Sequence, residues 1–319
     1  YLTAYDAETG ALAWRFYMTP NTMAFDLTGL KAATNYRVRV TAFDDFQNKS
    51  VALEGSFRTA GTLVLPEFPE VTPAPTGEFL HMAFDGDLSD DGAAASNAPT
   101  AAPVGSVSYV ASDREGATDQ AVRIAGGAGS YVNLGSRPEF DLGTDKDLTV
   151  SLWAKVTSVS GYGAIISNKN WANWYRSGIN LAPQGADTSK LEFTLGDGVN
   201  GVYATGDVAN YRGSWHLMTL TVDRERNIAS TYFDGKLAKE TSISSIGSMT
   251  SGLSMLLGVD GSKSYGAGLD VDDLRMWSSA LTEAEIASLF SADNTTAEVE
   301  ALTTTVQYAD ELVAANAVK

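Results

Sequence analysis

The 319-residue sequence has no cysteine and no uninterrupted run of about eighteen apolar residues. No disulfide can therefore hold the fold together, and no segment is predicted to span a membrane. The lack of cysteine does not by itself separate a secreted protein from a cytosolic one. With 44% hydrophobic residues, the chain can still bury sizeable cores, and its length suits about two domains.

Positive charge is also scarce. The chain has 22 lysines and arginines against 39 aspartates and glutamates, which gives a formal net charge of -17 at pH 7. The resulting negative potential repels nucleic acid and anionic membranes. We therefore expect neither a nucleic-acid partner nor insertion into a membrane.

Histidine is rare, and the two histidines present form no catalytic pattern. His81 and His216 lie far apart in the sequence, and neither has a serine or cysteine motif close by. We interpret both histidines as structural.

The N-terminal part carries the alternating pattern of a half-buried strand. Within residues 30–43, Tyr36 and Val38 fall on one face and Arg37 falls on the other. The stretch FDLTGLKAATNYRVRVTAFDDFQNKS resembles a fibronectin type III domain, in which a tyrosine such as Tyr36 hydrogen-bonds the preceding corner. The resemblance covers residues 1–60 and lacks the family's first strands, so we expect a domain that is truncated or irregular at its start.

The next segment is predicted to be a linker, because residues 61–77 hold four of the nine prolines. The last segment, residues 293–319, has a helical period of apolar residues and is predicted to be a helical tail or the start of a following module. The chain begins at Tyr1 within a strand-like pattern instead of at a methionine. We therefore expect it to be a piece of a longer protein.

Residues 78–292 are predicted to form the main domain. Many short runs of alternating apolar residues are separated by turn signals, which is typical of an all-β sandwich. A short helix is predicted at 281–290, where Thr282 and Glu285 have the spacing of a capping box.

Seven stretches of this domain carry a family resemblance. In chain order they are FDGDLSDDG, YVNLG, LTVSLWAKV, GAIISNKNW, GSWHLMTLTVDRE, YFDGKL and LDVDDLRMWSSALTEAEI. Together they resemble the bacterial laminin-G-like domains of the concanavalin A-like jelly-roll superfamily. The resemblance implies a jelly roll with tight hairpins at Asp197-Gly198 and Asp234-Gly235, and with Trp153 and Trp215 as packing anchors on the inner face.

Enzymes that share this fold and hydrolyse glucans carry an E-x-D-x-E motif on one strand, which places alternate carboxylates in the cleft. The sequence has no such motif, and its nearest stretch, LDVDDL at residues 269–274, has no glutamate. We therefore expect no catalysis from this domain. A catalytic domain, if one exists, would lie outside this stretch of chain.

Calcium is the cofactor that the sequence suggests. The loop FDGDLSDDG places Asp85 and Asp87 among four closely spaced aspartates, and calcium prefers such hard oxygen ligands. In laminin-G-like jelly rolls the first and last strands are neighbours, so the resemblance implies that Asp272 completes a structural calcium site. The alternative is that these aspartates only cap turns.

The stretch IISNKNWANWYRSGINLAP, residues 165–183, is the strongest candidate for a binding site. Aromatic faces stack on the C–H faces of sugar rings, and amide, ammonium and guanidinium groups donate hydrogen bonds to sugar oxygens. The candidate glycan-binding residues are Asn170, Lys169, Trp174, Tyr175, Arg176, Tyr203 and Tyr265. Tyr211 is a further candidate for the same surface. Trp171 is expected to pack at the rim of the core, and the same packing role is the alternative for the other aromatic residues.

We therefore predict a non-catalytic carbohydrate-binding module of a secreted or cell-surface bacterial protein, with polysaccharide and other modules of the chain as its partners. Such a module would concentrate glycan near an attached enzyme. The alternative is an architectural spacer or a protein-adhesion module without a glycan site. A binding module should expose Trp174 and Tyr175, whereas a spacer should bury them.

Overall fold

The computed structural model describes residues 2–6, 12–16, 35–40, 53–58, 74–94, 99–114, 116, 118, 120–159, 163–185 and 187–291. The chain divides into two compact units. The first unit comprises Tyr1–Val71 with Ser291–Lys319, and the second comprises Thr72–Phe290. The predicted tyrosine-corner contact before Tyr36, most of the predicted linker and the predicted helical tail lie outside the described residues.

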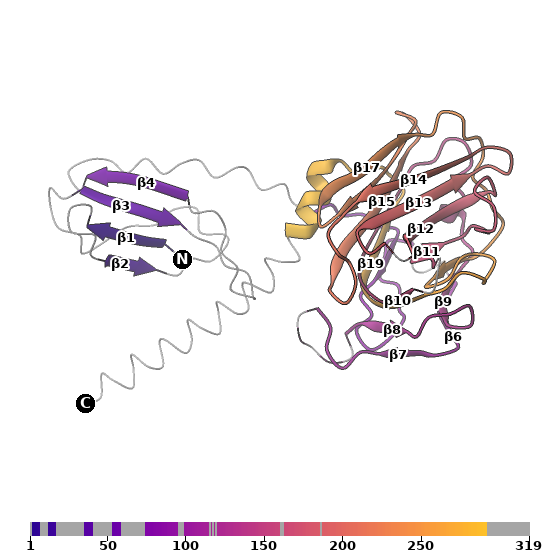
Figure 1. Ribbon diagram of the computed structural model, residues 1–319, viewed down its shortest axis with the longest axis horizontal. Helices are drawn as coiled ribbons and strands as arrows, with labels where there is room; N and C mark the ends of the chain where they lie inside the picture. Colours follow the sequence, from indigo (N-terminus) through magenta and orange to yellow (C-terminus); the bar gives the residue numbers. More distant parts are fainter. Residues whose placement is uncertain are drawn as a thin grey trace. The chain divides into compact units, whose positions relative to one another are not determined.

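The first unit contains a four-stranded antiparallel sheet in the order β2-β1-β3-β4 (Figure 1). Its strands are β1 (Leu2–Asp6), β2 (Leu12–Phe16), β3 (Asn35–Val40) and β4 (Leu53–Arg58). Tyr36 and Val38 are buried while Arg37 is exposed, which confirms the predicted alternation. Tyr36 stacks on Phe57, its cross-strand neighbour, with ring centroids 5.6 Å apart. The fibronectin type III assignment stays a prediction.

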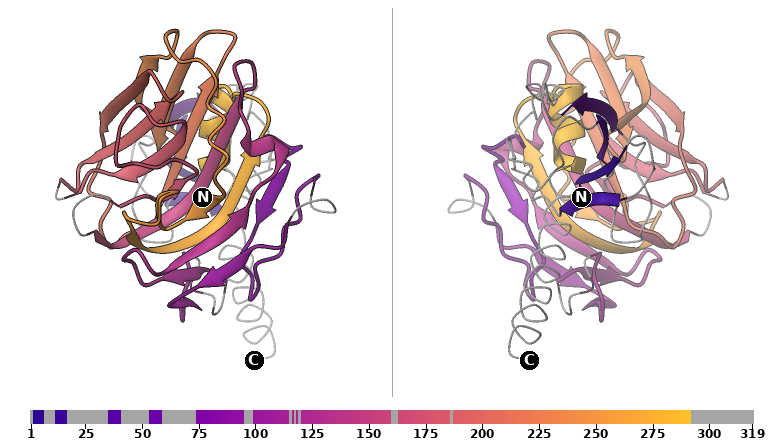
Figure 2. Two further views of the ribbon diagram at one scale, coloured as in Figure 1. Left: turned by 90° about the vertical axis from the view of Figure 1, so that its right-hand side faces the viewer. Right: turned by 90° about the vertical axis from the view of Figure 1, so that its left-hand side faces the viewer.

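The described part of the second unit is a sandwich of two antiparallel sheets (Figures 1 and 2). The eight-stranded sheet has the order β17-β16-β15-β10-β19-β8-β7, and β5 pairs with β19 at its side. Its strands are β5 (Leu80–Met82), β7 (Val107–Tyr109), β8 (Val122–Ile124), β10 (Leu148–Val159), β15 (His216–Asp223), β16 (Ile228–Phe233), β17 (Lys236–Ser242) and β19 (Ala267–Trp277). Figure 2 shows β10 and β19, in magenta and yellow, side by side within this sheet.

The seven-stranded sheet has the order β14-β13-β12-β11-β18-β9-β6. Its strands are β6 (Ala102–Val104), β9 (Tyr131–Gly135), β11 (Ile166–Ser167), β12 (Gly178–Pro183), β13 (Lys190–Gly196), β14 (Gly201–Asp207) and β18 (Met255–Leu257). A short 3-10 turn, η2 (Pro138–Phe140), follows β9. This arrangement confirms the predicted all-β jelly-roll sandwich.

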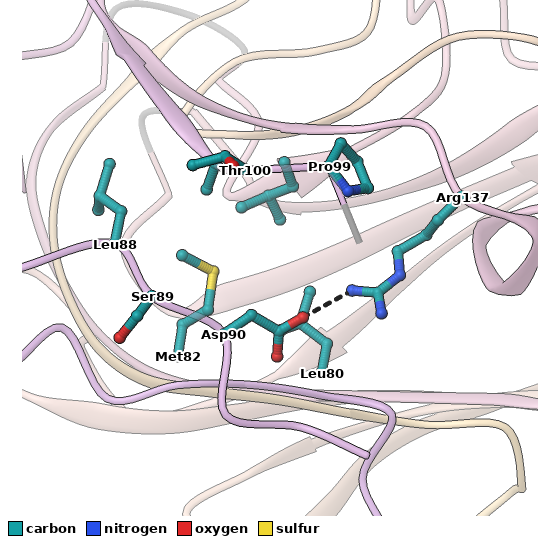
Figure 3. Close-up of a pocket in the computed structure, with 10 residues that line it drawn as sticks. Leu80, Met82, Leu88, Ser89, Asp90, Pro99, Thr100 and Arg137 are labelled. Atoms are coloured by element: carbon teal, nitrogen blue, oxygen red, sulfur yellow. Dashed lines mark hydrogen bonds and ion pairs between the residues drawn. The ribbon is translucent and has the colours of Figure 1, made fainter. Parts of the chain in front are cut away.

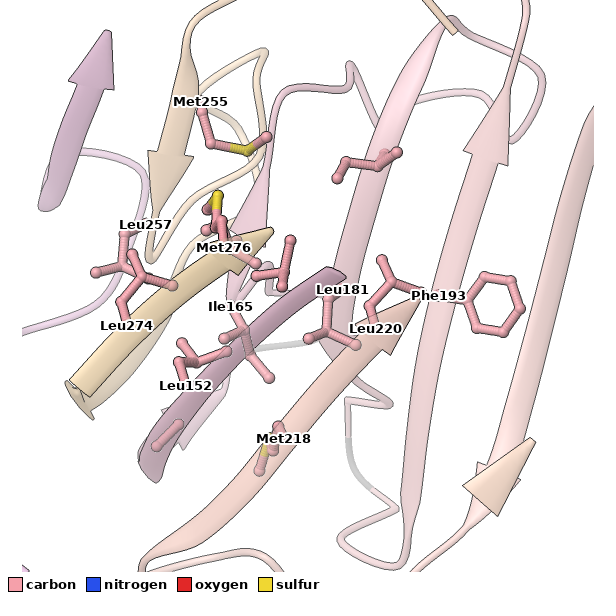
Figure 4. Packing of buried hydrophobic residues seen from close by; sticks show 14 of the residues in the cluster. Leu152, Ile165, Leu181, Phe193, Met218, Leu220, Met255, Leu257, Leu274 and Met276 are labelled. Atoms are coloured by element: carbon pink, nitrogen blue, oxygen red, sulfur yellow. The ribbon is translucent and has the colours of Figure 1, made fainter. Parts of the chain in front are cut away.

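The main hydrophobic core lies between the two sheets. Leu152, Leu220 and Leu274 reach it from the eight-stranded sheet, and Leu181 and Phe193 reach it from the seven-stranded sheet (Figure 4). All five side chains are almost completely buried. Because apolar burial contributes about 25 cal/mol per Å², this core can stabilise the unit without any disulfide.

A second hydrophobic cluster covers part of the eight-stranded sheet. Trp153 packs there with Leu217, Ile286 and Leu289, whereas its neighbour Leu152 points into the main core. Trp153 was predicted to anchor the inner face, and that prediction was wrong. Alternate side chains of a strand point to opposite faces, and helical residues 283–291 supply the cover that buries this tryptophan.

The predicted helix start and one predicted hairpin are confirmed. The Thr282 amide and hydroxyl both donate to Glu285 Oε2 over 2.8 Å, and the Glu285 amide donates back to Thr282 Oγ1 over 3.3 Å. Asp234 and Gly235 have φ of 50° and 73° in the turn between β16 and β17, as a tight hairpin requires. Within the described residues, every helix is too short or too polar to cross a membrane.

The first and last strands of the second unit are neighbours, as the resemblance implied. Leu80 pairs with Met276 in the ladder between β5 and β19. An ionic cluster reinforces the pair, because His81 Nε2 lies 2.8 Å from Asp273 Oδ1 and Arg275 Nε donates to the same oxygen over 2.9 Å. The hydrogen bond to Asp273 raises the pKa of His81, although burial opposes the shift.

Replacing His81 with glutamine is expected to weaken the second unit most at mildly acidic pH. Because the folded-state pKa is raised, the protonated histidine stabilises the fold fully below its ordinary pKa of about 6.5, and this contribution disappears as pH rises through the raised value. Urea unfolding should show the variant less stable by about 1 kcal/mol at pH 5.5, with a smaller difference at pH 9. A difference that is the same at both pH values would contradict the assignment.

Candidate functional site

The candidate site rests on a row of three glycines on the outer face of the seven-stranded sheet. Gly178, Gly196 and Gly201 are cross-strand neighbours on β12, β13 and β14. A Cβ on Gly201 would lie 2.5 Å from the carbonyl oxygen of Trp174, and one on Gly196 would lie 2.6 Å from that of Tyr175. Because these positions lack side chains, the backbone between β11 and β12 can lie directly on the sheet. We call this connection, residues 168–177, the platform loop.

Asp260 fastens the platform loop to the neighbouring loop at residues 260–265. Its buried carboxylate accepts hydrogen bonds from the Trp171 amide over 3.0 Å, the Ser262 hydroxyl over 2.5 Å and the Tyr265 amide over 2.9 Å. Hydrogen bonds to a charged acceptor are stronger than neutral ones. The ring of Trp171 also meets that of Tyr265 edge to face at 5.7 Å. One carboxylate therefore orders both loops.

Lys169 lies beneath the platform loop instead of on its surface. The side chain is fully buried, and its Nζ donates to the carbonyl oxygen of Arg176. Burial and the neighbouring Arg176 charge lower the pKa of Lys169 to about 7, partly offset by Asp197. The predicted glycan contact from this ammonium is therefore not available in the structure, because the group is used to hold the loop.

Asp197 fixes the turn between β13 and β14 next to the platform loop. Its carboxylate accepts hydrogen bonds from the amides of Val199 over 2.8 Å, Asn200 over 2.6 Å and Gly247 over 2.7 Å. Burial opposes ionisation, but the hydrogen bonds from Gly247, Asn200 and Val199 outweigh it and lower the pKa of Asp197 to about 2. The turn is thus held by a carboxylate that stays ionised.

The platform loop presents an exposed tryptophan. The side chain of Trp174 is 54% exposed, and its ring meets the half-buried Tyr175 edge to face at 6.3 Å. The exposed Arg176 has its guanidinium carbon 6.0 Å from the centre of the Tyr175 ring. An aromatic face, a phenol and a cation therefore lie together on one short segment, with Trp174 exposed as expected of a binding module and Tyr175 only half-exposed.

Strand β14 and its turn extend this surface. Tyr203 is 47% exposed and Val199 is 81% exposed, so both add apolar area near Trp174. The hydroxyl of Tyr203 donates to Glu192 Oε2 over 3.0 Å and accepts from Gln184 Nε2 over 2.9 Å. Burial raises the pKa of Glu192 to about 7, although the Tyr203 hydrogen bond opposes the shift.

The other sequence candidates take more structural positions. Asn170 Oδ1 accepts from the Ala172 amide over 3.0 Å and shapes the start of the platform loop. Tyr265 is half-buried against Trp171. Tyr211 is fully buried in the main core, where its hydroxyl donates to the Asp187 carbonyl over 2.8 Å. Tyr211 therefore offers no surface for a ligand.

The three aspartates predicted to bind calcium lie on two segments of the chain, and two of them have partners within the protein. Asp87 caps a turn by accepting hydrogen bonds from the Ser89 amide and hydroxyl, and Asp85 is exposed on the same loop. Asp272 is buried and paired with Arg114 Nε at 2.9 Å. Burial raises the pKa of Asp272 to about 7 in spite of the Arg114 charge. Within the described residues, His, Asp and Glu side chains form no group of three that could hold a metal ion.

A cavity of about 240 Å³ lies beside the same aspartate-rich loop (Figure 3). Its apolar walls include Leu80, Met82 and Leu134, and its polar wall is the ion pair between Asp90 and Arg137 at 2.9 Å. Because the buried Arg137 already compensates the Asp90 charge, this cavity offers little to a cation. The exposed platform is the better candidate site.

Sequence reasoning missed several residues of the site. Val199 lies in a turn with no aromatic or charged signal, and Asp260 and Glu192 carry no motif. Asp197 was singled out only for its turn. These residues become important because distant strands and loops meet around them, which local sequence spacing does not record.

Comparison with known proteins identifies the family of the domain. Residues 126–287, just over half of the chain, match the family model described as the concanavalin A-like lectin/glucanases superfamily. No curated protein matches the chain.

Solved structures share the fold at low sequence identity. The binding domain of botulinum neurotoxin serotype G has a TM-score of 0.54 and 15% identity, over 68% of this chain and 51% of that one. The binding domain of Paraclostridial Mosquitocidal Protein 1 has a TM-score of 0.55 and 14% identity, over 68% and 52%. The botulinum neurotoxin serotype D ligand binding domain in complex with N-acetylneuraminic acid has a TM-score of 0.53 and 15% identity, over 68% and 51%. The aligned part therefore spans about half of each of these structures.

Replacing Gly196 with alanine is expected to lift the platform loop, because the added methyl group would collide with the carbonyl oxygens of Tyr175 and Arg176. Such a clash with backbone typically costs about 1–3 kcal/mol. Trypsin should then cleave after Lys169, which is buried in the wild-type protein, and mass spectrometry of the fragments would measure the rate. Gly129→Ala is the matched control, because a Cβ there meets open space. Equal cleavage after Lys169 in both variants would contradict the role of the glycine row.

Replacing Glu192 with glutamine is expected to remove part of the pH dependence of stability. The folded protein keeps a proton on Glu192 up to about pH 7, whereas the unfolded chain releases it near pH 4.5. Wild-type stability should therefore fall between these pH values, and the variant should be more stable by about 3 kcal/mol at pH 8. Urea unfolding from pH 4 to 8 measures this difference, with the exposed Glu225→Gln as control. Parallel wild-type and Glu192→Gln curves would contradict the shift.

Proposed function

Because the chain belongs to the concanavalin A-like lectin/glucanases superfamily, we propose that its second unit is a non-catalytic carbohydrate-binding module. The observation that carries this proposal is the 54% exposure of Trp174 on a loop whose backbone is fixed by the glycine row and by Asp260. A large exposed aromatic residue costs solvation free energy in the free protein. Its fixed position suits it to a ligand with a flat apolar face.

The surface offers the contacts that a sugar ring requires. The Trp174 face stacks on ring C–H groups, while Arg176 and Asn170 supply hydrogen bonds to hydroxyl or carboxylate oxygens. Tyr203 and the half-buried Tyr175 widen the platform. Because the loop is already ordered by hydrogen bonds, little conformational entropy is lost on binding.

The fold neighbours support the proposal in general terms. They are binding domains, and one of them was solved with N-acetylneuraminic acid. The exposed guanidinium of Arg176 would pair with the carboxylate of such an acidic sugar, so acidic as well as neutral glycans belong among the candidate ligands.

The wider setting of the module is part of the same proposal. A single exposed platform binds weakly, and its value would come from holding an attached enzyme close to a polymer that offers many sites. The fold neighbours include binding domains of toxins, which supports a proposed secreted or cell-surface location. Structural calcium at Asp85, Asp87 and Asp272 is a separate proposal that rests on the sequence resemblance.

The test is a glycan array probed with the full chain in calcium and in chelator, using neutral, uronic-acid and sialylated oligosaccharides. Trp174→Ala is expected to lower affinity for the bound glycan at least about tenfold, because the main stacking surface is removed. Val104→Ala is the matched control, since Val104 is also exposed but lies on β6, the opposite edge strand of the same sheet. This control should bind like the wild type.

The outcomes separate the candidate functions. Absence of binding to every glycan by folded protein in calcium would contradict the proposal and favour the spacer or the protein-adhesion module. Equal glycan affinity of the wild type and Trp174→Ala would show that the glycan binds elsewhere on the domain. A higher melting temperature in calcium than in chelator would support the calcium site. Identical melting temperatures would contradict that proposal.

A further inference from the structure

Beside the glycine row lies a second row of polar residues, three of which are fully buried. Asn180 on β12 and Thr194 on β13 are cross-strand neighbours, and Tyr203 on β14 continues the row. Glu192 lies two residues from Thr194 and therefore on the same face. The residues between them, such as Phe193, point into the main core. We call Asn180, Glu192 and Thr194 the polar strip; all three are 0% exposed.

Four polar atoms of the strip lack hydrogen-bond partners among the described residues. They are Asn180 Nδ2, Asn180 Oδ1, Glu192 Oε1 and Thr194 Oγ1. Buried polar groups are nearly always paired, and an unpaired one costs the full penalty of its desolvation. A concentration of four such atoms on neighbouring positions therefore marks a place where hydrogen-bonding groups of a ligand would be stabilising.

The strip adjoins the platform, and the Tyr203 side chain is hydrogen-bonded to one residue of the strip. Tyr203 starts on β14 and reaches back over β13 to donate to Glu192, yet its ring is 47% exposed. Its hydroxyl is held by Gln184 and Glu192, with one hydrogen bond to each. Two residues earlier on the same strand, Gly201 contacts Trp174, so strip and platform are about 7 Å apart along the strand.

We propose that the polar strip is a hydrogen-bonding subsite for the hydroxyl groups of a sugar, reached when the Tyr203 side chain moves aside. The inference rests on the proposed glycan-binding function and adds buried hydrogen-bonding groups to the exposed ones of the platform. Stacking on Trp174 discriminates poorly between sugars, because most pyranose rings have an apolar face. The polar strip distinguishes between sugars through the positions of their hydroxyl groups.

The chemistry of the strip fits hydroxyl groups better than a charged ligand. Asn180 offers both a donor and an acceptor, and a threonine hydroxyl can act as either. A sugar hydroxyl also donates and accepts, so adjacent hydroxyls can satisfy all of these atoms at once. Arginine and lysine are absent from the strip, so a carboxylate or sulfate would find no countercharge there. The edge of the sugar that contacts the polar strip is therefore uncharged.

The test uses near-isosteric apolar replacements in the full chain. Asn180→Leu combined with Thr194→Val removes three of the unpaired atoms while keeping similar volume. The strongest ligand among the array oligosaccharides serves as the probe, with affinity measured by titration calorimetry and stability by thermal melting. We expect affinity to fall about tenfold to a hundredfold, whereas the melting temperature should stay the same or rise, because no internal hydrogen bond is lost.

Thr194→Ser is the matched control, because it keeps the hydroxyl and removes a methyl group. It should bind within about twofold of the wild type. If glycan binding depends on Trp174 but the folded Asn180→Leu, Thr194→Val variant binds as tightly as the wild type, the subsite is wrong and the proposed function stands. A clear drop in melting temperature in this variant would show a structural role and overturn the subsite. If the wild type binds no glycan, both the subsite and the proposed function fall.

Discussion

The candidate site depends on the absence of three side chains. Where Gly178, Gly196 and Gly201 lie in one row, the sheet has a shallow strip of bare backbone, and the platform loop occupies it. The loop gains van der Waals contact along its backbone instead of through side chains. Trp174 and Arg176 are therefore free to face solvent, while Lys169 is directed inward as a support. Exposure and rigidity, which usually oppose each other in a loop, are combined here.

Aspartate carboxylates provide most of the remaining order in these loops. Asp260 joins two loops, Asp197 closes a turn, and Asp87 caps another, each by accepting amide hydrogen bonds. The ion pair of His81 with Asp273 joins the first and last strands of the domain, and Arg114, between β7 and β8, pairs with Asp272 of the last strand. Part of the strong negative charge of the chain thus has a structural use. Turn capping, which was the alternative to calcium at the sequence level, is visible at Asp87.

Features set by local spacing could be predicted from the sequence. The alternation at Tyr36 and Val38, the turn at Asp234 and the capping box at Thr282 each need only a few neighbouring residues, and the jelly roll followed from several such segments in order. The face on which Trp153 packs could not be predicted. The strand LTVSLWAKV is buried on both sides, so its period does not distinguish the faces, and the covering helix lies far along the chain.

The candidate site could be predicted only in part, because it also depends on contacts between segments that are distant in the sequence. Trp174 and Lys169 belong to one short segment of similar composition, yet one is exposed and the other is buried. What separates them is the position of Gly196 and Gly201 on strands that follow later in the chain. The unpaired atoms of Asn180 and Thr194 likewise depend on cross-strand register. A sequence pattern indicates which residue types are present, whereas the register decides which of them meet.

The pairing of β5 with β19 has a consequence for how such a domain is reused in evolution. Because Leu80 lies opposite Met276, the chain enters and leaves the sandwich at adjacent points. A gene segment that encodes this domain can therefore be inserted into a surface loop of another protein without forcing the two flanking ends apart. The domain is then a transferable cassette, and changes in its platform loop alter recognition without disturbing the host fold.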